Sequence, residues 1–171
     1  FDANMHLRTR GEVEAGRECD HLSQMTDAVT DPALDELLCF DLYTAQHAFG
    51  RLYKTLLGPL DLTYPQYLVL RTLWAESPQS VGEIGKRLHL ETNTLTPLLK
   101  RLEAQGRVRR VRDTADERRV LVRLTEGGRG LEARAAHVPR RVAQATGMTQ
   151  SEAIELQARL RTLADQLNRV S

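Results

Sequence analysis

The 171-residue sequence has two cysteines, almost no net charge and no long apolar run, and each shortage excludes a class of protein. No segment approaches the roughly 18 consecutive apolar residues of a membrane-spanning helix, and the first residues lack the apolar stretch of a signal peptide. Two cysteines, Cys19 and Cys39, cannot build a disulfide framework or, alone, a zinc site. We therefore expect a cytoplasmic protein with no membrane partner, no metal and no cofactor.

The net charge of +1 conceals a segregation along the chain. Residues 1–83 carry 6 basic and 13 acidic side chains, residues 84–129 carry 12 basic and 6 acidic ones, and residues 130–171 carry 6 and 4. A basic block inside a balanced chain is typical of a protein that binds a polyanion, although a charge run alone is more often solvated surface. The local structure around the block has to decide between these interpretations.

Capping and stop signals predict three helices in the first half of the chain. The first begins at Asp31-Pro32, with Asp31 as its N-cap, and ends at Gly58-Pro59. The second opens with a capping box from Thr63 to Gln66 and closes at Ser77-Pro78. A third, short helix starts with the capping box from Ser80 to Glu83.

The residues that follow predict the second helix of a helix-turn-helix. A turn over residues 89–91 leads into a helix whose cap is Thr92 or Asn93. Pro97 falls in the first turn of this helix, where a missing N–H is tolerated, and Gly106 ends it. Two short helices joined by a tight turn indicate a helix-turn-helix.

The apolar period then shortens, which predicts β-structure. Strands are expected over 108–111 and 120–124, with a polar hairpin tip over 113–118. Two long helices follow, from 125 to about 145 and from 149 to 170. The expected fold class is mostly α with a small β-wing, that is, a winged helix-turn-helix with further helices at both ends.

Polar residues at the start of the recognition helix and arginines on the hairpin predict binding to duplex DNA. The second helix of a helix-turn-helix enters the major groove with its N-terminal end first. The residues placed there are Thr92, Asn93, Thr94 and Thr96. Lys100 and Arg101 lie further along and suit phosphate. The wing supplies Arg107, Arg109, Arg110, Arg112, Arg118 and Arg119, and Asp116 is placed to stiffen the tip by pairing with Arg118. Singly these residues are ordinary caps and solubilising charges, but jointly they indicate a DNA-binding surface.

The tyrosines near Cys39 leave two interpretations open. Tyr43 follows Cys39 by four residues and Tyr53 follows it by 14, so a continuous helix places all three near one face. Tyr64 opens the next helix. Phenolic O–H groups that donate to sulfur stabilise the thiolate and favour its reaction with electrophiles. Equally, Cys39 is a small buried apolar residue and the tyrosines only pack.

Residues 90–128, LETNTLTPLLKRLEAQGRVRRVRDTADERRVLVRLTEGG, resemble the recognition helix and wing of the MarR family of winged-helix regulators. Asp116-Glu-Arg118 and Leu124-Thr125 match the D-x-R and LT pattern of that wing, and the resemblance runs from residue 31 to about 170. It implies a homodimer with an interface of N- and C-terminal helices, and a pseudo-palindromic operator with half-sites about 34–36 Å apart. It also implies that Arg118 enters the minor groove. The expected DNA-binding residues are Thr92, Asn93, Thr94, Thr96, Pro97, Lys100, Arg101, Arg112, Asp116, Arg118 and Arg119.

Leu38-Cys-Phe40 with Tyr43, Tyr53 and Thr63-Tyr-Pro-Gln-Tyr67 is similar to the OhrR subgroup, which senses organic hydroperoxides. The resemblance implies that Cys39 is the redox sensor and that Tyr43, Tyr53 and Tyr64 donate hydrogen bonds to it. Some members use a second cysteine in the C-terminal region, and residues 125–171 contain none. The chain therefore resembles the one-cysteine type, whose oxidised sulfur is capped by a small cellular thiol. The expected function is a repressor, not an enzyme, that is released from DNA when organic hydroperoxide oxidises Cys39.

Together these expectations give four segments. They are an N-terminal extension over 1–30 that is in part non-native, a sensor and dimerisation helix over 31–62, a winged helix-turn-helix DNA-binding domain over 63–124, and C-terminal dimerisation helices over 125–171.

Two alternative functions are considered for the same residues. A repressor could instead be released by a small aromatic ligand, in a pocket lined by His47, Trp74 or His89. A thiol peroxidase would need a resolving partner such as a CxxC pair, and the chain has none.

Overall fold

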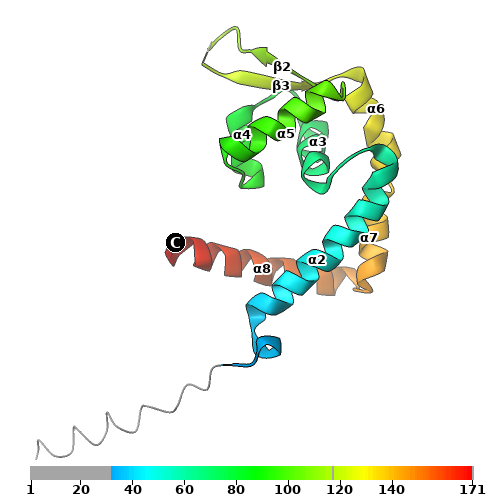
Figure 1. Cartoon of the computed structure of the whole chain (residues 1–171), viewed down its shortest axis with the longest axis vertical. Coiled ribbons are helices and arrows are strands. Elements are labelled where there is room, and N and C mark those ends of the chain that lie inside the picture. Colours follow the sequence, from blue (N-terminus) through cyan, green and yellow to red (C-terminus); the bar gives the residue numbers. More distant parts are fainter. Residues whose placement is uncertain (1–31, 117, 171) are drawn as a thin grey trace, which may run out of the picture. The chain divides into compact units, whose positions relative to one another are not determined.

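The computed structural model describes residues 32–116 and 118–170, so the expected N-terminal extension, Asp31 and Cys19 lie outside the described residues. The chain divides between Thr44 and Ala45 into two compact units, and a single helix crosses the division (Figure 1). The elements are, in chain order, η1 (Leu34–Glu36), α2 (Leu38–Leu57), η2 (Gly58–Leu60), α3 (Tyr64–Ala75), β1 (Gln79–Ser80), α4 (Val81–Leu88), α5 (Thr92–Ala104), β2 (Val108–Arg112), β3 (Val120–Leu124), α6 (Glu126–Ala135), α7 (Val138–Thr146) and α8 (Gln150–Val170).

The first long helix starts later than the sequence predicts. Backbone hydrogen bonds from the Glu36 N–H to the Ala33 carbonyl at 2.9 Å and from the Leu37 N–H to the Leu34 carbonyl at 3.3 Å form a single 3-10 turn, η1. The Glu36 carboxylate caps it by accepting from the Ala33 N–H at 3.2 Å. Leu37 then adopts an extended backbone, with φ −84° and ψ 119°, so α2 begins only at Leu38. The prediction of one helix continuous from Pro32 is therefore wrong, whereas its end before Gly58-Pro59 is confirmed.

The predicted capping boxes fix the starts of α3 and α4. The Gln66 side-chain oxygen accepts from the Thr63 N–H at 2.8 Å. The Glu83 carboxylate accepts from the Ser80 N–H at 2.7 Å, and the Ser80 hydroxyl oxygen accepts from the Glu83 N–H at 3.2 Å. Each box pairs backbone N–H groups that the first turn of a helix leaves without a partner. Both helix starts are confirmed.

Helix α5 differs from the prediction at its N-terminal end. Its N-cap is Glu91, so the helix begins at Thr92, one residue earlier than a Thr92 cap would place it. Pro97 is consequently the sixth helical residue and lies beyond the first turn. Because proline has no N–H, the carbonyl oxygen of Asn93 lacks its usual donor four residues on. Gly106, with φ +67°, lies just past the helix end as predicted.

The wing is part of a three-stranded antiparallel sheet in the order β1-β3-β2. The predicted strands β2 and β3 are confirmed, and their register pairs Val108 with Leu124 and Arg112 with Val120. The two-residue strand β1 was not predicted, since two residues carry no periodic signal. It joins the beginning of α4 to the sheet by pairing Ser80 with Leu121.

The chain after the wing forms three helices where two were expected. Helix α6 ends at Ala135 and α7 begins at Val138, with Pro139 in its first turn. Ala136 and His137 separate the two helices, and Pro139 in the first turn of α7 has no N–H to donate one turn back, so the prediction of one helix over 125–145 is wrong. The last helix, α8, starts as predicted after the cap formed by Thr149 and Glu152. None of the described helices is long and apolar enough to cross a membrane.

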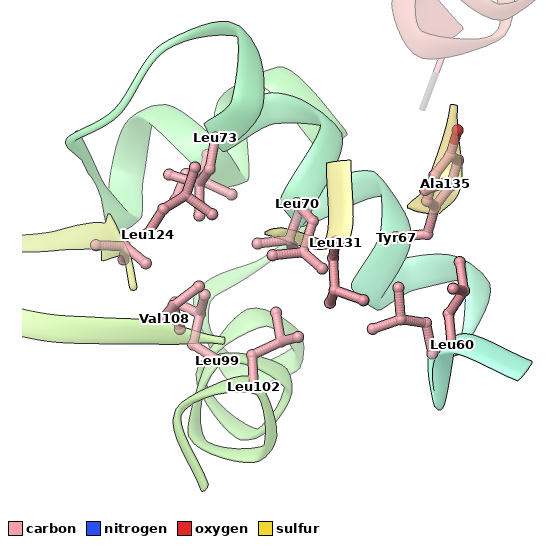
Figure 2. Close-up of a cluster of buried hydrophobic side chains, with 14 of the residues drawn as sticks. Leu60, Tyr67, Leu70, Leu73, Leu99, Leu102, Val108, Leu124, Leu131 and Ala135 are labelled. Carbon is pink, nitrogen blue, oxygen red and sulfur yellow. The ribbon is translucent and has the colours of Figure 1, made fainter. Parts of the chain in front are cut away.

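One apolar cluster holds the helix-turn-helix and the wing together (Figure 2). Leu99 and Leu102 of α5 are essentially inaccessible to solvent, as are Leu70 of α3 and Val108 of β2. Leu131 brings α6 into the same cluster. The buried leucines therefore fix the recognition helix on one side and leave its opposite side exposed.

The wing joins α6 through a close backbone approach at Gly128. A Cβ atom on Gly128 would lie 2.0 Å from the carbonyl oxygen of Arg107, a separation that no side chain can occupy. The carbonyl of Gly128 accepts from the indole N–H of Trp74 at 2.9 Å, and the Thr125 hydroxyl donates to Arg107 at 3.0 Å. Glycine is thus required where α3, β2 and α6 meet.

We expect Gly128→Ala to reduce the free energy of unfolding by about 3 kcal/mol, because the added methyl group must displace backbone. Gly130→Ala is the matched control on the same helix, where a Cβ would meet nothing within 4 Å. It should stabilise the protein by about 0.5–1 kcal/mol. Urea unfolding of both variants tests this, and equal effects would contradict the close approach.

Candidate nucleic-acid interface and thiol site

The solvent side of α5 carries all the predicted base and phosphate contacts from this helix. Leu95, Leu99 and Leu102 are buried on one side. The other side presents Thr92, Asn93, Thr94, Thr96, Pro97, Lys100 and Arg101, of which only Thr96 is half-buried and the rest are exposed. The leucine spacing therefore turns the polar residues outward as a set.

A groove between the helix-turn-helix and the wing brings residues from both together. It has a volume of about 450 Å³. Its lining includes Thr92 and Thr96 of α5, Arg118 and Arg119 beside β3, and Arg110 of β2. Three arginines and two threonines thus line one depression, although the residues lie far apart in sequence.

The tip of the wing is stiffened in a way that differs in detail from the prediction. The Asp116 carboxylate accepts from the backbone N–H of Arg118 at 3.0 Å, whereas the sequence predicted a pair with the side chain. The Asp113 carboxylate accepts from the Ala115 N–H at 3.0 Å in a similar turn. Arg112, Asp116 and Arg118 are all exposed. The turn leaves the Arg118 guanidinium available to a partner.

Two other wing arginines bind carboxylates of the helix-turn-helix. Arg119 pairs with Glu83 at 3.1 Å, and Arg110 pairs with Glu103 at 2.7 Å. Hydrogen bonds from the backbone and hydroxyl of Ser80, and the charge of Arg119, lower the pKa of Glu83. The backbone and side chain of Arg110 lower the pKa of Glu103. Neither pair was predicted, because residues 36 apart, as Glu83 and Arg119 are, have no local pattern that links them.

Cys39 lies at the start of α2 and is exposed, with its thiol outside any disulfide. Tyr43 lies one turn later on the same helix and is also exposed, and its ring stacks on that of Phe40 with centroids 6.4 Å apart. This exposure is that of the single chain, and α2 is also the expected dimerisation helix, so the packed and the reactive alternatives both stay open. Its hydrogen bonds to the three tyrosines stay a prediction.

Tyr53 and Tyr64 form a close pair at the other end of α2. Their ring centroids are 4.1 Å apart, and Tyr67 lies 6.2 Å from Tyr53. Burial and the neighbouring phenols, including a hydrogen bond with Tyr64, raise the pKa of Tyr53 to about 12. Two of the three predicted sensor tyrosines are thus brought together.

A chain of amide hydrogen bonds connects the Tyr64 end of α3 to the end of α5. The buried Gln66 side chain, which caps α3, donates to the Gln105 side chain at 3.2 Å. Gln105, at the C-cap of α5, donates in turn to the Asp61 carboxylate at 3.1 Å. This contact has no local signal in the sequence, since Gln66 and Gln105 are 39 residues apart.

The residues proposed for an aromatic-ligand pocket have separate roles. Trp74 uses its indole N–H to bind Gly128. His89 is the left-handed C-cap of α4, with φ 52°, and His47 is exposed on α2. None of the three is among the residues that line the groove between α5 and the wing. Within residues 32–116 and 118–170, no group of three His, Cys, Asp or Glu side chains is arranged to hold a metal ion.

The Tyr53 pair predicts a pH dependence of stability. A phenol with a raised pKa keeps its proton in the folded state, so its contribution is complete below pH 10 and is lost as the pH rises towards 12. We expect Tyr53→Phe to lose less stability than the parent protein between pH 10 and 11, as measured by urea unfolding. Tyr43→Phe, away from this pair, serves as the control, and identical slopes for the parent and Tyr53→Phe would contradict the assignment.

Comparison with known proteins places the chain in a family. Residues 51–134 match the family model described as transcriptional regulator SarA/Rot. The transcriptional regulator TtmR of Methylorubrum extorquens is 54% identical over 139 residues, which cover 81% of this chain and 71% of TtmR. The organic hydroperoxide resistance transcriptional regulator of Bacillus subtilis is 39% identical over 135 residues, 79% of this chain and 92% of that protein.

The solved structure of reduced AbfR bound to DNA has the same fold, with a TM-score of 0.66 and 32% identity over 89% of this chain and 98% of AbfR. AbfR, from Staphylococcus epidermidis, is also known in an overoxidised form bound to DNA and in a disulfide form. The matched family, TtmR and the Bacillus protein are transcriptional regulators rather than enzymes, in agreement with the sequence prediction. The chain belongs to the SarA/Rot and MarR-type family of winged-helix transcriptional regulators.

Proposed function

We propose that this regulator is a repressor that binds duplex DNA through α5 and the wing. The groove between them carries the proposal, because it places Thr92 and Thr96 of α5 on the same depression as Arg118 of the wing. The surrounding basic block, residues 84–129, supplies the charge that duplex DNA attracts. The DNA-bound form of AbfR, which shares the fold, supports the same assignment.

The side chains suggest how the contacts are divided. The N-terminal half of α5 reads base edges in the major groove through Thr92, Asn93, Thr94, Thr96 and Pro97. Lys100 and Arg101, further along, bind phosphate. Arg118 enters the minor groove from the wing tip, with Arg112 close by, and Asp116 holds its backbone.

The protein is proposed to act as a homodimer. Large apolar side chains are exposed on α2 and α8, among them Leu38, Phe49, Ile154, Leu160 and Leu167. No residue of α8 is buried in the described chain, so its apolar side chains lack the cover that a stable helix of this length requires. A second copy would bury them, and its two wings would then face a pseudo-palindromic operator.

The proposed signal is oxidation of Cys39 by an organic hydroperoxide in the reducing cytoplasm. The exposed thiolate attacks the peroxide ROOH, the O–O bond breaks, and the products are the sulfenic acid and the alcohol ROH once a proton is taken up. A small cellular thiol then condenses with the sulfenic acid, which gives a mixed disulfide and water. The 39% identity to the Bacillus organic hydroperoxide regulator supports this choice of oxidant.

The mixed disulfide, rather than an overoxidised cysteine, is proposed to release DNA. AbfR is known bound to DNA in its overoxidised form, which indicates that added oxygen atoms alone need not cause release. AbfR also forms a disulfide, but residues 40–171 of this chain contain no cysteine that could provide one. A small thiol supplies the missing sulfur and adds bulk at the start of α2.

Cys39→Ser should bind operator as the parent protein does but stay bound after treatment with cumene hydroperoxide and a small thiol, because serine cannot form the mixed disulfide. A gel-shift assay combined with mass spectrometry of residue 39 measures both steps. Cys19→Ser is the matched control and should be released normally. Normal release of the Cys39 variant would exclude the thiol sensor and favour a ligand-released repressor.

Arg118→Ala should weaken operator binding about 10- to 100-fold, which corresponds to about 1.4–2.8 kcal/mol, with Cys39 oxidised at the parent rate. Fluorescence anisotropy over a range of salt concentrations measures the affinity. Arg161→Ala, an exposed arginine of α8, is the control and should have little effect. Equal affinity of the parent and Arg118→Ala would remove Arg118 from the interface.

A further inference from the structure

Two carboxylates of the helix-turn-helix each bind one side of the wing. Glu103, on the last turn of α5, accepts from the Arg110 backbone N–H and from its Nε, both at 2.8 Å. The same carboxylate lies 2.7 Å from Nη2 of Arg110. One side chain thus binds both the main chain and the guanidinium of β2, a bidentate arrangement with a defined direction.

Glu83 makes the corresponding contact on the other strand. Its Oε2 accepts from the Ser80 N–H at 2.7 Å, as part of the cap of α4. Its Oε1 accepts from Nη2 of Arg119 at 3.1 Å. Ser80 itself pairs with Leu121 in the sheet. The cap therefore holds the carboxylate in place, and the carboxylate holds Arg119.

These contacts, which we call the wing brace (Glu83–Arg119 and Glu103–Arg110), lie at the base of the tip. Arg119 directly precedes β3, and Arg110 is opposite Val122 in the register. Within the tip, the Asp113 N–H donates to the Arg119 carbonyl at 3.0 Å and the Arg119 N–H donates to the Asp116 carbonyl at 2.9 Å. Since the tip is bonded within itself, its direction is set where it joins the body.

The brace affects orientation more than global stability. Both pairs are partly exposed, and the Glu83 and Arg119 side chains keep 56% and 46% of their surface accessible. Exposed pairs contribute little to the free energy of unfolding. A change of a few degrees at the base of a hairpin nevertheless displaces its tip, where Arg118 lies.

We propose that Glu83 and Glu103 are positioning residues, which brace the wing against α4 and α5 so that Arg118 meets the minor groove. Arg119 then serves the brace, and its guanidinium is satisfied by Glu83 in place of a DNA phosphate. This refines the sequence expectation that Arg119 contacts DNA. It rests on the proposed function, since it assumes that the wing contacts DNA through Arg118.

Glu83→Gln tests the brace because glutamine keeps an oxygen for the Ser80 N–H but loses the charge that pairs with Arg119. We expect it to weaken operator binding about fivefold or more, with the salt dependence of affinity unchanged. Arg119→Gln should have the same effect, and the double variant should be no worse than either. In an Arg118→Ala background, Glu83→Gln should cost nothing further.

The opposite result is equally clear. If Arg119 binds phosphate, Arg119→Gln will lower the slope of log affinity against log salt by about one. Glu83→Gln will then strengthen binding, because it releases Arg119 for DNA. Either observation would overturn the brace.

Glu152→Gln is the matched control for the cap alone. Glu152 accepts from the Thr149 N–H at 2.8 Å at the start of α8, as Glu83 does for Ser80, but it forms no ion pair with an arginine among the described residues. It should leave operator affinity unchanged, and a fivefold loss there would assign the Glu83 effect to capping.

Hydrogen exchange without DNA separates failure of the brace from failure of the proposed function. The backbone N–H groups of Asp113 and Arg119 are hydrogen-bonded in the wing, and they should exchange faster in Glu83→Gln than in the parent protein. If the parent protein binds no operator sequence, the proposed DNA-binding function is rejected. The expected faster exchange in Glu83→Gln can still be measured in that case. Unchanged exchange would reject the brace directly.

Discussion

The contact between Gly128 and the Arg107 carbonyl is the constraint on which the DNA-binding unit depends. It allows α6 to leave the wing directly over the strand that follows α5. Trp74 of α3 binds the same glycine, so three elements share one backbone position. The apolar cluster beneath it then fixes α5 through Leu99 and Leu102. The recognition helix and the wing are thus held by close backbone contact and by buried leucines. Their exposed polar side chains take no part in this packing.

The sequence predicted the parts of the fold that carry local signals. Capping boxes at Thr63 and Ser80 and the alternation around Val122 gave correct starts for two helices and the wing. The errors share a cause. Pro139 lies in the first turn of α7, where the apolar pattern alone would continue one helix, and the extended backbone of Leu37 separates η1 from α2. Strand β1 is too short to have a period.

Some residues of the candidate sites also follow from local sequence signals, and others do not. The polar side of α5 follows from its leucine spacing, so Thr92 and its neighbours could be placed outward from sequence alone. The partners of the wing arginines could not, since Glu83 meets Arg119 only after the sheet has formed. The exposure of Cys39 was likewise open, because the same residue suits a core or a surface. Tertiary contacts decide these questions, and no pattern of neighbours along the chain encodes them.

The side-chain hydrogen bonds from Gln66 through Gln105 to Asp61 link the N-terminal end of α3 to the C-terminal end of α5. They tie the residue that caps α3, beside Tyr64, to the last turn of the recognition helix. If modification of the proposed sensor Cys39 changes the affinity for DNA, thermodynamic reciprocity requires DNA to change the equilibrium of that modification by the same factor. A repressor seated on its operator would then resist capping more than one in solution. The amount of modified protein would then depend on the fraction of the protein that is not bound to DNA, and so on the number of operators in the cell.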